Sequence, residues 1–156
     1  MKTAIIYISK NGATEKVAGM LQKSNKTKDI EAFNLKEKKH IDLHNYQNII
    51  IGSPIYAGKI MNPVKRFIDD NMVQLLNMNV SLFICCMDDN RADEELQNAY
   101  PELLRKHALF CEHVGGEFNF KRMNFVERTI VKKISGVKNS LQKFNFGKIS
   151  ALADSI

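Results

Sequence analysis

The sequence has few cysteines and no long apolar run, and both shortages narrow the class of protein. It holds three cysteines in 156 residues: Cys85 and Cys86 are adjacent, Cys111 stands alone, and no Cys-x-x-Cys spacing occurs. Such usage is typical of a reducing compartment rather than of a disulfide framework. No apolar stretch reaches the roughly 18 residues of a membrane span, and the stretch near the N-terminus is too short for the core of a secretory signal. We therefore expect a cytoplasmic globular protein.

The common nucleotide and metal motifs are missing as well. Neither Gly-x-Gly-x-x-Gly nor Gly-x-x-x-x-Gly-Lys-Ser/Thr occurs, which excludes the dinucleotide fingerprint and the triphosphate-binding loop. The histidines are scattered without metal-ligand spacing, at His40, His44, His107 and His113. Acidic residues are outnumbered, with 17 Asp and Glu against 23 Lys and Arg, and the net charge of +6 favours an anionic partner.

Apolar strands alternate with helical segments along the chain. The expected strands cover residues 3–8, 29–35, 47–52, 79–87 and 112–120, and the expected helices cover 12–24, 62–75, 93–110 (with a break at Pro101) and 147–156. This alternation predicts an α/β domain with a five-stranded parallel sheet and helices on both faces. Residues 121–147 do not fit it and are interpreted as a basic insertion within a single domain of residues 1–156.

Polar residues and glycine follow the first strand directly, in the stretch Ser-Lys-Asn-Gly-Ala-Thr at residues 9–14. In such a sheet, ligands bind outside the carboxyl ends of the strands. The stretch opens a helix, so free backbone N–H groups and the helix dipole favour an anion there. The alternative is that Ser9, Asn11 or Thr14 simply caps the helix.

Two further loops follow the third and fourth strands. The first places Ile55 and Tyr56 outside any expected strand, where an aromatic ring suits a flat ligand; alternatively, Tyr56 packs on the next helix. The second loop begins at Met87, and its backbone and polar side chains could bond the edge of a ligand ring. Alternatively, this loop is only the N-terminus of a helix with acidic residues in its first turn. The candidate binding residues are Ser9, Lys10, Asn11, Gly12, Ala13 and Thr14; Ser53, Pro54, Ile55, Tyr56, Ala57 and Gly58; and Cys86, Met87, Asp88, Asp89 and Asn90.

The first loop resembles the phosphate loop of flavodoxins, [ST]-x-[TN]-G-x-[TS], and the two later loops match that family in place and character. The resemblance implies a three-layer sandwich with strand order 2-1-3-4-5. It also implies FMN as cofactor, with its phosphate on residues 9–14 and its isoalloxazine between residues 54–58 and 87–90. The flavin then carries the electrons, so no side chain is expected to be an essential acid or base.

Two stretches resemble the menaquinone-dependent protoporphyrinogen dehydrogenases of the flavodoxin superfamily. They are IIIGSPIYAGKIMNPVKRFI after the third strand and VGGEFNFKRMNFVERTIVKKISG later in the chain. The resemblance implies an oxidoreductase that passes electrons from a porphyrinogen to a quinone. The chain departs from that group in carrying Ile55 where a basic residue usually precedes the tyrosine, and in having fewer aromatic residues in the second stretch. The alternative function is an electron carrier for a protein partner, although typical carriers are acidic and this chain is basic.

Residues 121–143 form a basic segment with seven Lys and Arg residues and one acidic residue, Glu127. Its apolar residues fall on one side of a helix: Met123, Val126, Ile130, Val131 and Ile134. A basic amphipathic helix can lie on an anionic membrane, here the inner face of the cell membrane, or meet an acidic partner or the propionates of a porphyrin. The alternative is an ordinary surface helix. No recognition motif supports nucleic-acid binding.

Two other classes of protein, phosphotyrosine phosphatases and receiver domains, are disfavoured. Cys85 and Arg91 have the Cys-x5-Arg spacing of phosphotyrosine phosphatases, but two aspartates inside that loop would repel a phosphate, and Cys85 lies in an expected strand. A receiver domain needs acidic residues after the first strand and an aspartate at the end of the third. The chain has Ser9 and Lys10 at the first place and Gly52 and Ser53 at the second.

Overall fold

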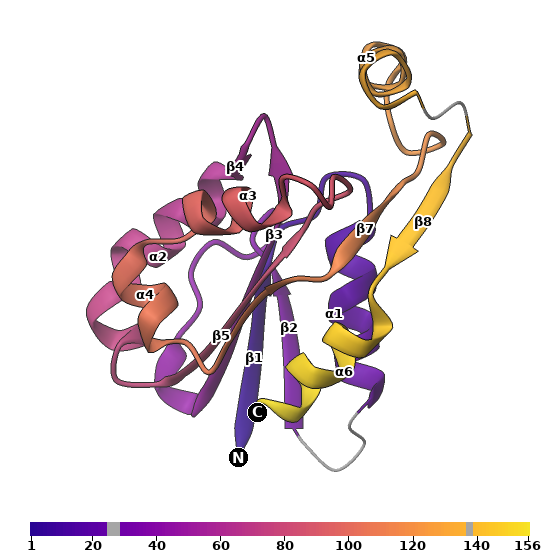
Figure 1. The fold of residues 1–156 in the computed structure, drawn as a ribbon. Coiled ribbons are helices and arrows are strands. Elements are labelled where there is room, and N and C mark those ends of the chain that lie inside the picture. Colours follow the sequence, from indigo (N-terminus) through magenta and orange to yellow (C-terminus); the bar gives the residue numbers. More distant parts are fainter. Residues whose placement is uncertain (25–28, 137–138) are drawn as a thin grey trace.

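The computed structural model of the chain describes residues 1–24, 29–136 and 139–156. Its centre is a parallel sheet in the order β2-β1-β3-β5-β6, with the short strand β4 paired antiparallel to the end of β3 (Figure 1). The strands are β1 (Lys2–Tyr7), β2 (Asp29–Asn34), β3 (Asn48–Tyr56), β4 (Lys59–Ile60), β5 (Asn79–Cys85) and β6 (Phe110–His113). The predicted α/β fold and strand order are confirmed, because β4 only shifts the numbering of the later strands.

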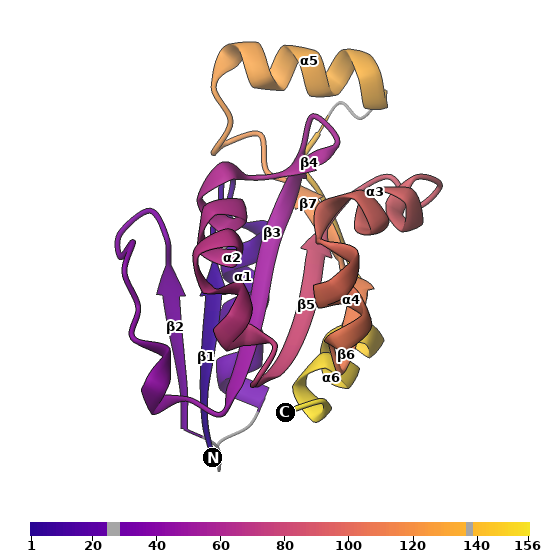
Figure 2. The ribbon, with the colours of Figure 1, turned by 90° about the vertical axis from the view of Figure 1, so that its left-hand side faces the viewer.

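Helices cover both faces of the sheet (Figures 1 and 2). One face carries α1 (Ala13–Ser24) and α6 (Phe146–Asp154); the other carries α2 (Asn62–Leu75), α3 (Ala92–Ala99) and α4 (Glu102–His107), and a 3-10 turn, η1 (Leu43–Asn45), precedes β3. The expected break at Pro101 separates α3 from α4, because proline lacks the N–H that a continuous helix needs.

The central strands are apolar on both faces because helices cover both. Ile49, Ile50 and Ile51 are consecutive in β3 and are all fully buried. Ile50 packs in the cluster with Leu21 of α1, while its two neighbours pack in the cluster on the α2 side. Successive side chains of a strand point to opposite faces, so an unbroken apolar run indicates a central strand.

The third strand is longer than predicted. It continues through Ile55 and Tyr56, which pair with Ile60 and Lys59 of β4, so these two residues do not lie outside a strand as expected. The two residues between the strands, Ala57 and Gly58, both have positive φ, of 51° and 75°. That backbone is typical of the tight turn of a two-residue hairpin. The expected open loop is therefore a β-hairpin.

The predicted strand at 112–120 is two strands in different sheets. β6 ends at His113, and β7 (Gly115–Phe118) pairs antiparallel with β8 (Leu141–Phe144) outside the main sheet. The chain turns at Gly115, which has φ +80° and would bring a Cβ within 1.9 Å of the Lys143 carbonyl oxygen. Only glycine allows both this turn and the close approach of β8.

We call residues 115–144 the insert. It projects beyond the carboxyl ends of the main strands, and α5 (Phe125–Ser135) lies at its tip (Figures 1 and 2). Within the basic segment at 121–143, the helix α5 covers only Phe125–Ser135, so Met123 lies outside it. It begins after the cap Asn124, whose side chain accepts from the Glu127 amide, and it ends at Gly136 in the left-handed conformation. The side chain of Ile134 and residues 137–138 lie outside the described part of the chain.

Candidate functional site

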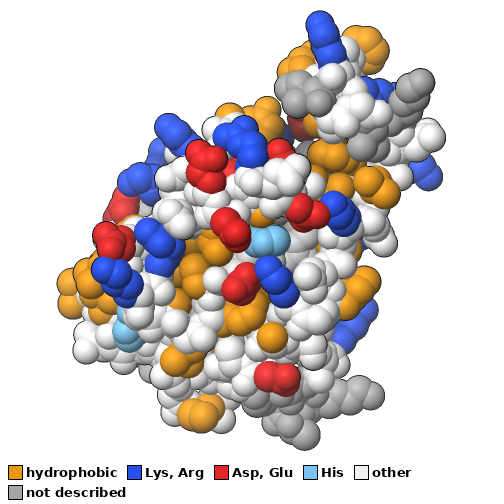
Figure 3. Space-filling model, viewed as in Figure 1, with side chains coloured by type: hydrophobic (Ala, Val, Ile, Leu, Met, Phe, Trp, Pro, Cys, Tyr) orange, Lys and Arg blue, Asp and Glu red, His pale blue; other side chains and the backbone are white. Residues whose placement is uncertain are grey.

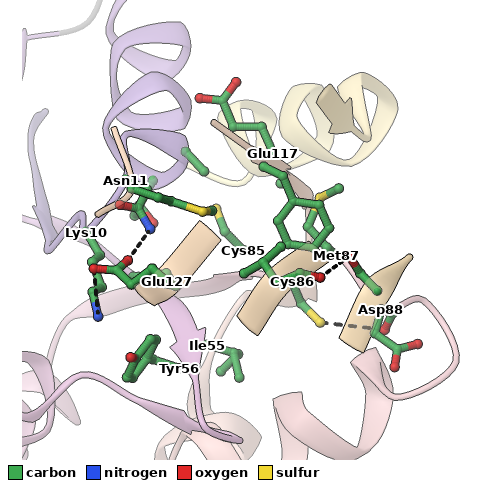
Figure 4. A pocket seen from close by; sticks show the side chains of 18 of the residues that line it. Lys10, Asn11, Ile55, Tyr56, Cys85, Cys86, Met87, Asp88, Glu117 and Glu127 are labelled. Carbon is green, nitrogen blue, oxygen red and sulfur yellow. Dashed lines mark hydrogen bonds and ion pairs between the residues drawn. The ribbon is translucent and has the colours of Figure 1, made fainter. Parts of the chain in front are cut away.

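A cavity of about 730 Å³ lies at the carboxyl end of the sheet, where ligands of such folds bind (Figure 4). Its volume is in the range of small-molecule and cofactor sites. Predicted residues from all three loops line it: Ser9, Lys10, Asn11, Ala13, Thr14, Pro54, Ile55, Tyr56, Ala57, Gly58, Cys86, Met87 and Asp88. The fold thus brings together three stretches that are far apart in the sequence.

Four predicted residues lie outside this lining and have other contacts. Gly12 donates its amide to Ser9 Oγ at 3.0 Å. Ser53 Oγ donates to the Pro54 carbonyl and accepts from the Met61 amide, which holds the hairpin to the start of α2. Asp89 pairs with Lys143 of the insert, and this ammonium group holds the pKa of the carboxyl below its usual range. Asn90 donates its amide to the Asp88 carboxylate.

The loop at residues 9–14 keeps a buried hydroxyl available to a ligand. Ser9 Oγ already accepts from Gly12 and therefore holds the turn before α1. The Thr14 side chain is 1% exposed and lies beside the Cys85 thiol, yet its hydroxyl has no partner of hydrogen-bonding geometry among the described residues. A buried polar group without a partner is costly. An anion at the start of α1 would supply one.

Tyr56 lies at the mouth of the cavity rather than against α2. The residue is 54% exposed, and Lys10 Nζ lies over its ring at 3.5 Å from the centroid (Figure 4). The hairpin turn presents the ring to the loop at residues 9–14, so a planar ligand entering here would meet an aromatic ring.

We expect Tyr56→Ala to weaken flavin binding and to raise the emission of the bound flavin, because a stacked phenol quenches it. Titration of the purified parent and variant, followed by flavin fluorescence, measures both quantities. Tyr56→Phe is the matched control, since it keeps the ring. Unchanged emission and affinity in the alanine variant would show that Tyr56 has no role in ring binding.

The two adjacent cysteines, Cys85 and Cys86, line the cavity as uncharged thiols. Burial raises the pKa of the Cys85 thiol to about 12. Burial, together with a hydrogen bond from its Sγ to the Glu95 carboxylate, raises the pKa of Cys86 to about 12. Both side chains therefore stay protonated at neutral pH, whereas a nucleophilic cysteine must be a thiolate. This agrees with the exclusion of phosphatase chemistry.

The comparison with known proteins places the chain in a family. A family model described as "Flavodoxin domain" matches residues 4–143. The chain belongs to the flavodoxin family. A flavodoxin of Clostridium saccharobutylicum is 32% identical over 74 residues, which is 46% of this chain and 46% of that protein. The match therefore spans about half the length of this curated relative.

Solved structures share the fold of this flavodoxin domain. The rubredoxin:oxygen oxidoreductase of Desulfovibrio gigas matches 99% of this chain and 35% of its own, with a TM-score of 0.63 and 17% identity. The two-electron reduced flavodoxin of Megasphaera elsdenii matches 71% of this chain and 84% of its own, with a TM-score of 0.56 and 19% identity. At these identities the likeness concerns the fold alone.

The insert contributes ten of the 25 described residues that line the cavity of this flavodoxin domain, and reasoning from the sequence missed them. The lining residues that were not predicted are Cys85, Glu95, Gly116, Glu117, Phe118, Met123, Glu127, Ile130, Val131, Ser135, Leu141 and Lys143. The apolar residues on one side of the basic segment were the feature of the sequence that could have indicated its place in the cavity lining. Nothing local in the sequence, however, showed that the pairing of β7 with β8 brings the segment back over the cavity.

Polar and charged contacts join the insert to the loop at residues 9–14 and to α1. Glu127 Oε2 accepts from Asn11 Nδ2 at 3.3 Å, and its Oε1 lies 3.9 Å from Lys10 Nζ (Figure 4). Glu117, buried in β7, pairs with Lys16 Nζ at 2.8 Å. The flavodoxin core and the insert therefore build the site together.

Proposed function

We propose that this flavodoxin domain binds FMN and works in redox chemistry. The observation that carries the proposal is the buried Thr14 hydroxyl, which has no hydrogen-bond partner among the described residues and lines the cavity where α1 begins. Hydroxyl and backbone donors at a helix start suit a phosphate. FMN supplies the electron transfer when it is bound.

The residues of the chain fit the two parts of FMN. Residues 9–14 would hold the phosphate, whereas Tyr56, Ile55 and Met87 would contact the ring. The insert adds Phe118 and Ile130 to the lining of the cavity, and these apolar side chains would exclude water from a bound ring. These residues bind and orient the cofactor, and none is required to move a proton.

The cofactor is tested by purifying the protein without its ligand and titrating it with FMN and with riboflavin. FMN should bind far more tightly, because riboflavin lacks the phosphate. Retention of FMN with its visible spectrum through gel filtration should accompany this preference. Equal affinity for the two flavins would contradict the phosphate site.

We further propose an oxidoreductase that resembles the quinone-dependent protoporphyrinogen dehydrogenases. The resemblance of the insert sequence and the basic net charge support it. The alternative is an electron carrier for a protein partner. Anaerobic mixing of the FMN-loaded protein with protoporphyrinogen, then with a menaquinone, separates the two functions. Reduction of the flavin by the porphyrinogen and its reoxidation by the quinone support the enzyme, and the absence of both supports the carrier.

The insert also suits contact with an anionic membrane, which we propose as the place of the quinone reaction. Phe125 and Val126 of α5 are 76% and 63% exposed and do not line the cavity, so the ordinary packing of an apolar helix side on the domain does not apply to them. The same helix carries Arg128, Lys132 and Lys133, and basic side chains are visible on this projecting part (Figure 3). Among the described residues, no helix is long and apolar enough to cross a bilayer.

Changing Arg128, Lys132 and Lys133 to glutamate should abolish binding to anionic vesicles. Each cation near such a surface contributes about 1 kcal/mol, and reversal converts attraction into repulsion. Co-sedimentation at low and high salt, with neutral vesicles as control, measures the effect. FMN content should be unchanged, because none of the three residues lines the cavity. Failure of the parent to bind anionic vesicles at low salt would exclude the membrane role.

A further inference from the structure

The insert places a cation directly on the phosphate loop. A Cβ built on Gly12 would lie 2.3 Å from Arg122 Nη1 and 3.1 Å from its Cζ, so the guanidinium occupies the space that a side chain at position 12 would need. Gly12 itself has φ +100° and stands between two lining residues, Asn11 and Ala13. Arg122 belongs to the turn after β7, more than a hundred residues away in the sequence.

The present partner of Arg122 holds it weakly. Arg122 Nη1 donates to Glu15 Oε2 at 3.4 Å, and the two side chains are 49% and 50% exposed. An exposed pair of this kind contributes little to stability, because water and salt screen it. A guanidinium makes stronger, often bidentate bonds to a phosphate. A phosphate in the loop would therefore compete well for this side chain.

The charges around the loop show why such a cation is needed. Two carboxylates, Glu15 and Glu127, contact side chains of the loop or of Arg122, and Lys10 and Arg122 oppose them. Without Arg122, Lys10 would be the one cation of this group left to oppose the two carboxylates. Because like charges raise the free energy of the complex, the loop would then repel the ligand that its hydroxyls and amides attract.

We propose that Arg122 is a phosphate-binding residue of this domain, supplied by the insert, and that it sets the preference for FMN over riboflavin. This inference rests on the proposed function. The unpartnered Thr14 hydroxyl, 1% exposed and lining the same end of the cavity, independently indicates a ligand there. The insert then has a second role besides covering the ring: it completes the anion site.

The test titrates the flavin-free parent and three variants with FMN and with riboflavin at low and high salt. Arg122→Gln should bind FMN about tenfold more weakly or worse at low salt, with riboflavin affinity unchanged and a smaller loss at high salt. Arg122→Lys should restore part of the affinity. Lys121→Gln is the matched control, because it removes one charge from the neighbouring exposed residue, and it should leave both affinities unchanged.

Glu15→Gln provides a change of opposite sign. It removes the carboxylate that competes for Arg122, so FMN affinity should rise or stay the same. If Arg122→Gln bound FMN as tightly as the parent while the parent still preferred FMN to riboflavin, the role of Arg122 would be refuted and the proposed function would stand. If the parent bound both flavins equally, the proposed function would fail, and this inference with it. Circular dichroism of each variant checks that the fold is kept.

Discussion

Replacing Ser9 and Thr14 together with alanine should weaken FMN binding by about 3 kcal/mol or more, a loss of roughly a hundredfold. Hydrogen bonds to a charged group contribute about 1.5–3 kcal/mol each. The Thr14 hydroxyl is buried and available, and Ser9 Oγ holds the Gly12 amide that shapes the loop. Fluorescence titration of the flavin-free double variant with FMN measures the loss.

Two comparisons separate phosphate binding from general damage to the loop. Riboflavin affinity should change little in the double variant, because riboflavin has no phosphate and therefore makes no phosphate contacts that the substitutions could remove. Thr14→Ser keeps the hydroxyl and should bind FMN nearly as the parent does, whereas Thr14→Ala should not. Equal losses for FMN and riboflavin would mean that the substitutions disturb the fold rather than a phosphate contact.

Replacing Phe83 with alanine should lower the free energy of unfolding by about 3–5 kcal/mol, as for other buried phenylalanines. Phe83 is fully buried in β5 and packs in the cluster with Val17, Ile50 and Leu152. Its ring lies directly against Gly52 of β3, where a Cβ would come within 2.1 Å of Cζ. Urea unfolding of parent and variant measures the change.

The contact between Phe83 and Gly52 makes the two positions interdependent. Gly52→Ala alone should destabilise by about 1–3 kcal/mol through overpacking. In the Phe83→Ala background the ring is gone, so the added methyl should cost much less or fill part of the cavity. A double-mutant cycle measures this coupling. Simple additivity of the two losses would show that the ring moves aside freely.

The turn at residues 9–14 before α1 and the central strands could be predicted because their signals are local. Ile49 to Ile51 form an apolar run that only a doubly covered strand explains, and residues 9–14 follow directly on another such strand. The β3–β4 hairpin could not be predicted in the same way. β4 has two residues, Lys59 and Ile60, and so short a strand has no periodicity to read.

By itself, the sequence determined the α/β class, the strand order through its family resemblance, and the three loops that meet at the carboxyl edge. Each depends on neighbours in the chain or on the rule that parallel strands end together. Only the tertiary structure decided that Gly115 turns the chain out of the main sheet, and that β7 and β8 pair across 22 intervening residues between Phe118 and Leu141. That pairing places Arg122 and Glu127 on the loop that begins α1. Contacts of this kind depend on backbone geometry and long-range packing, which no local pattern of residues specifies.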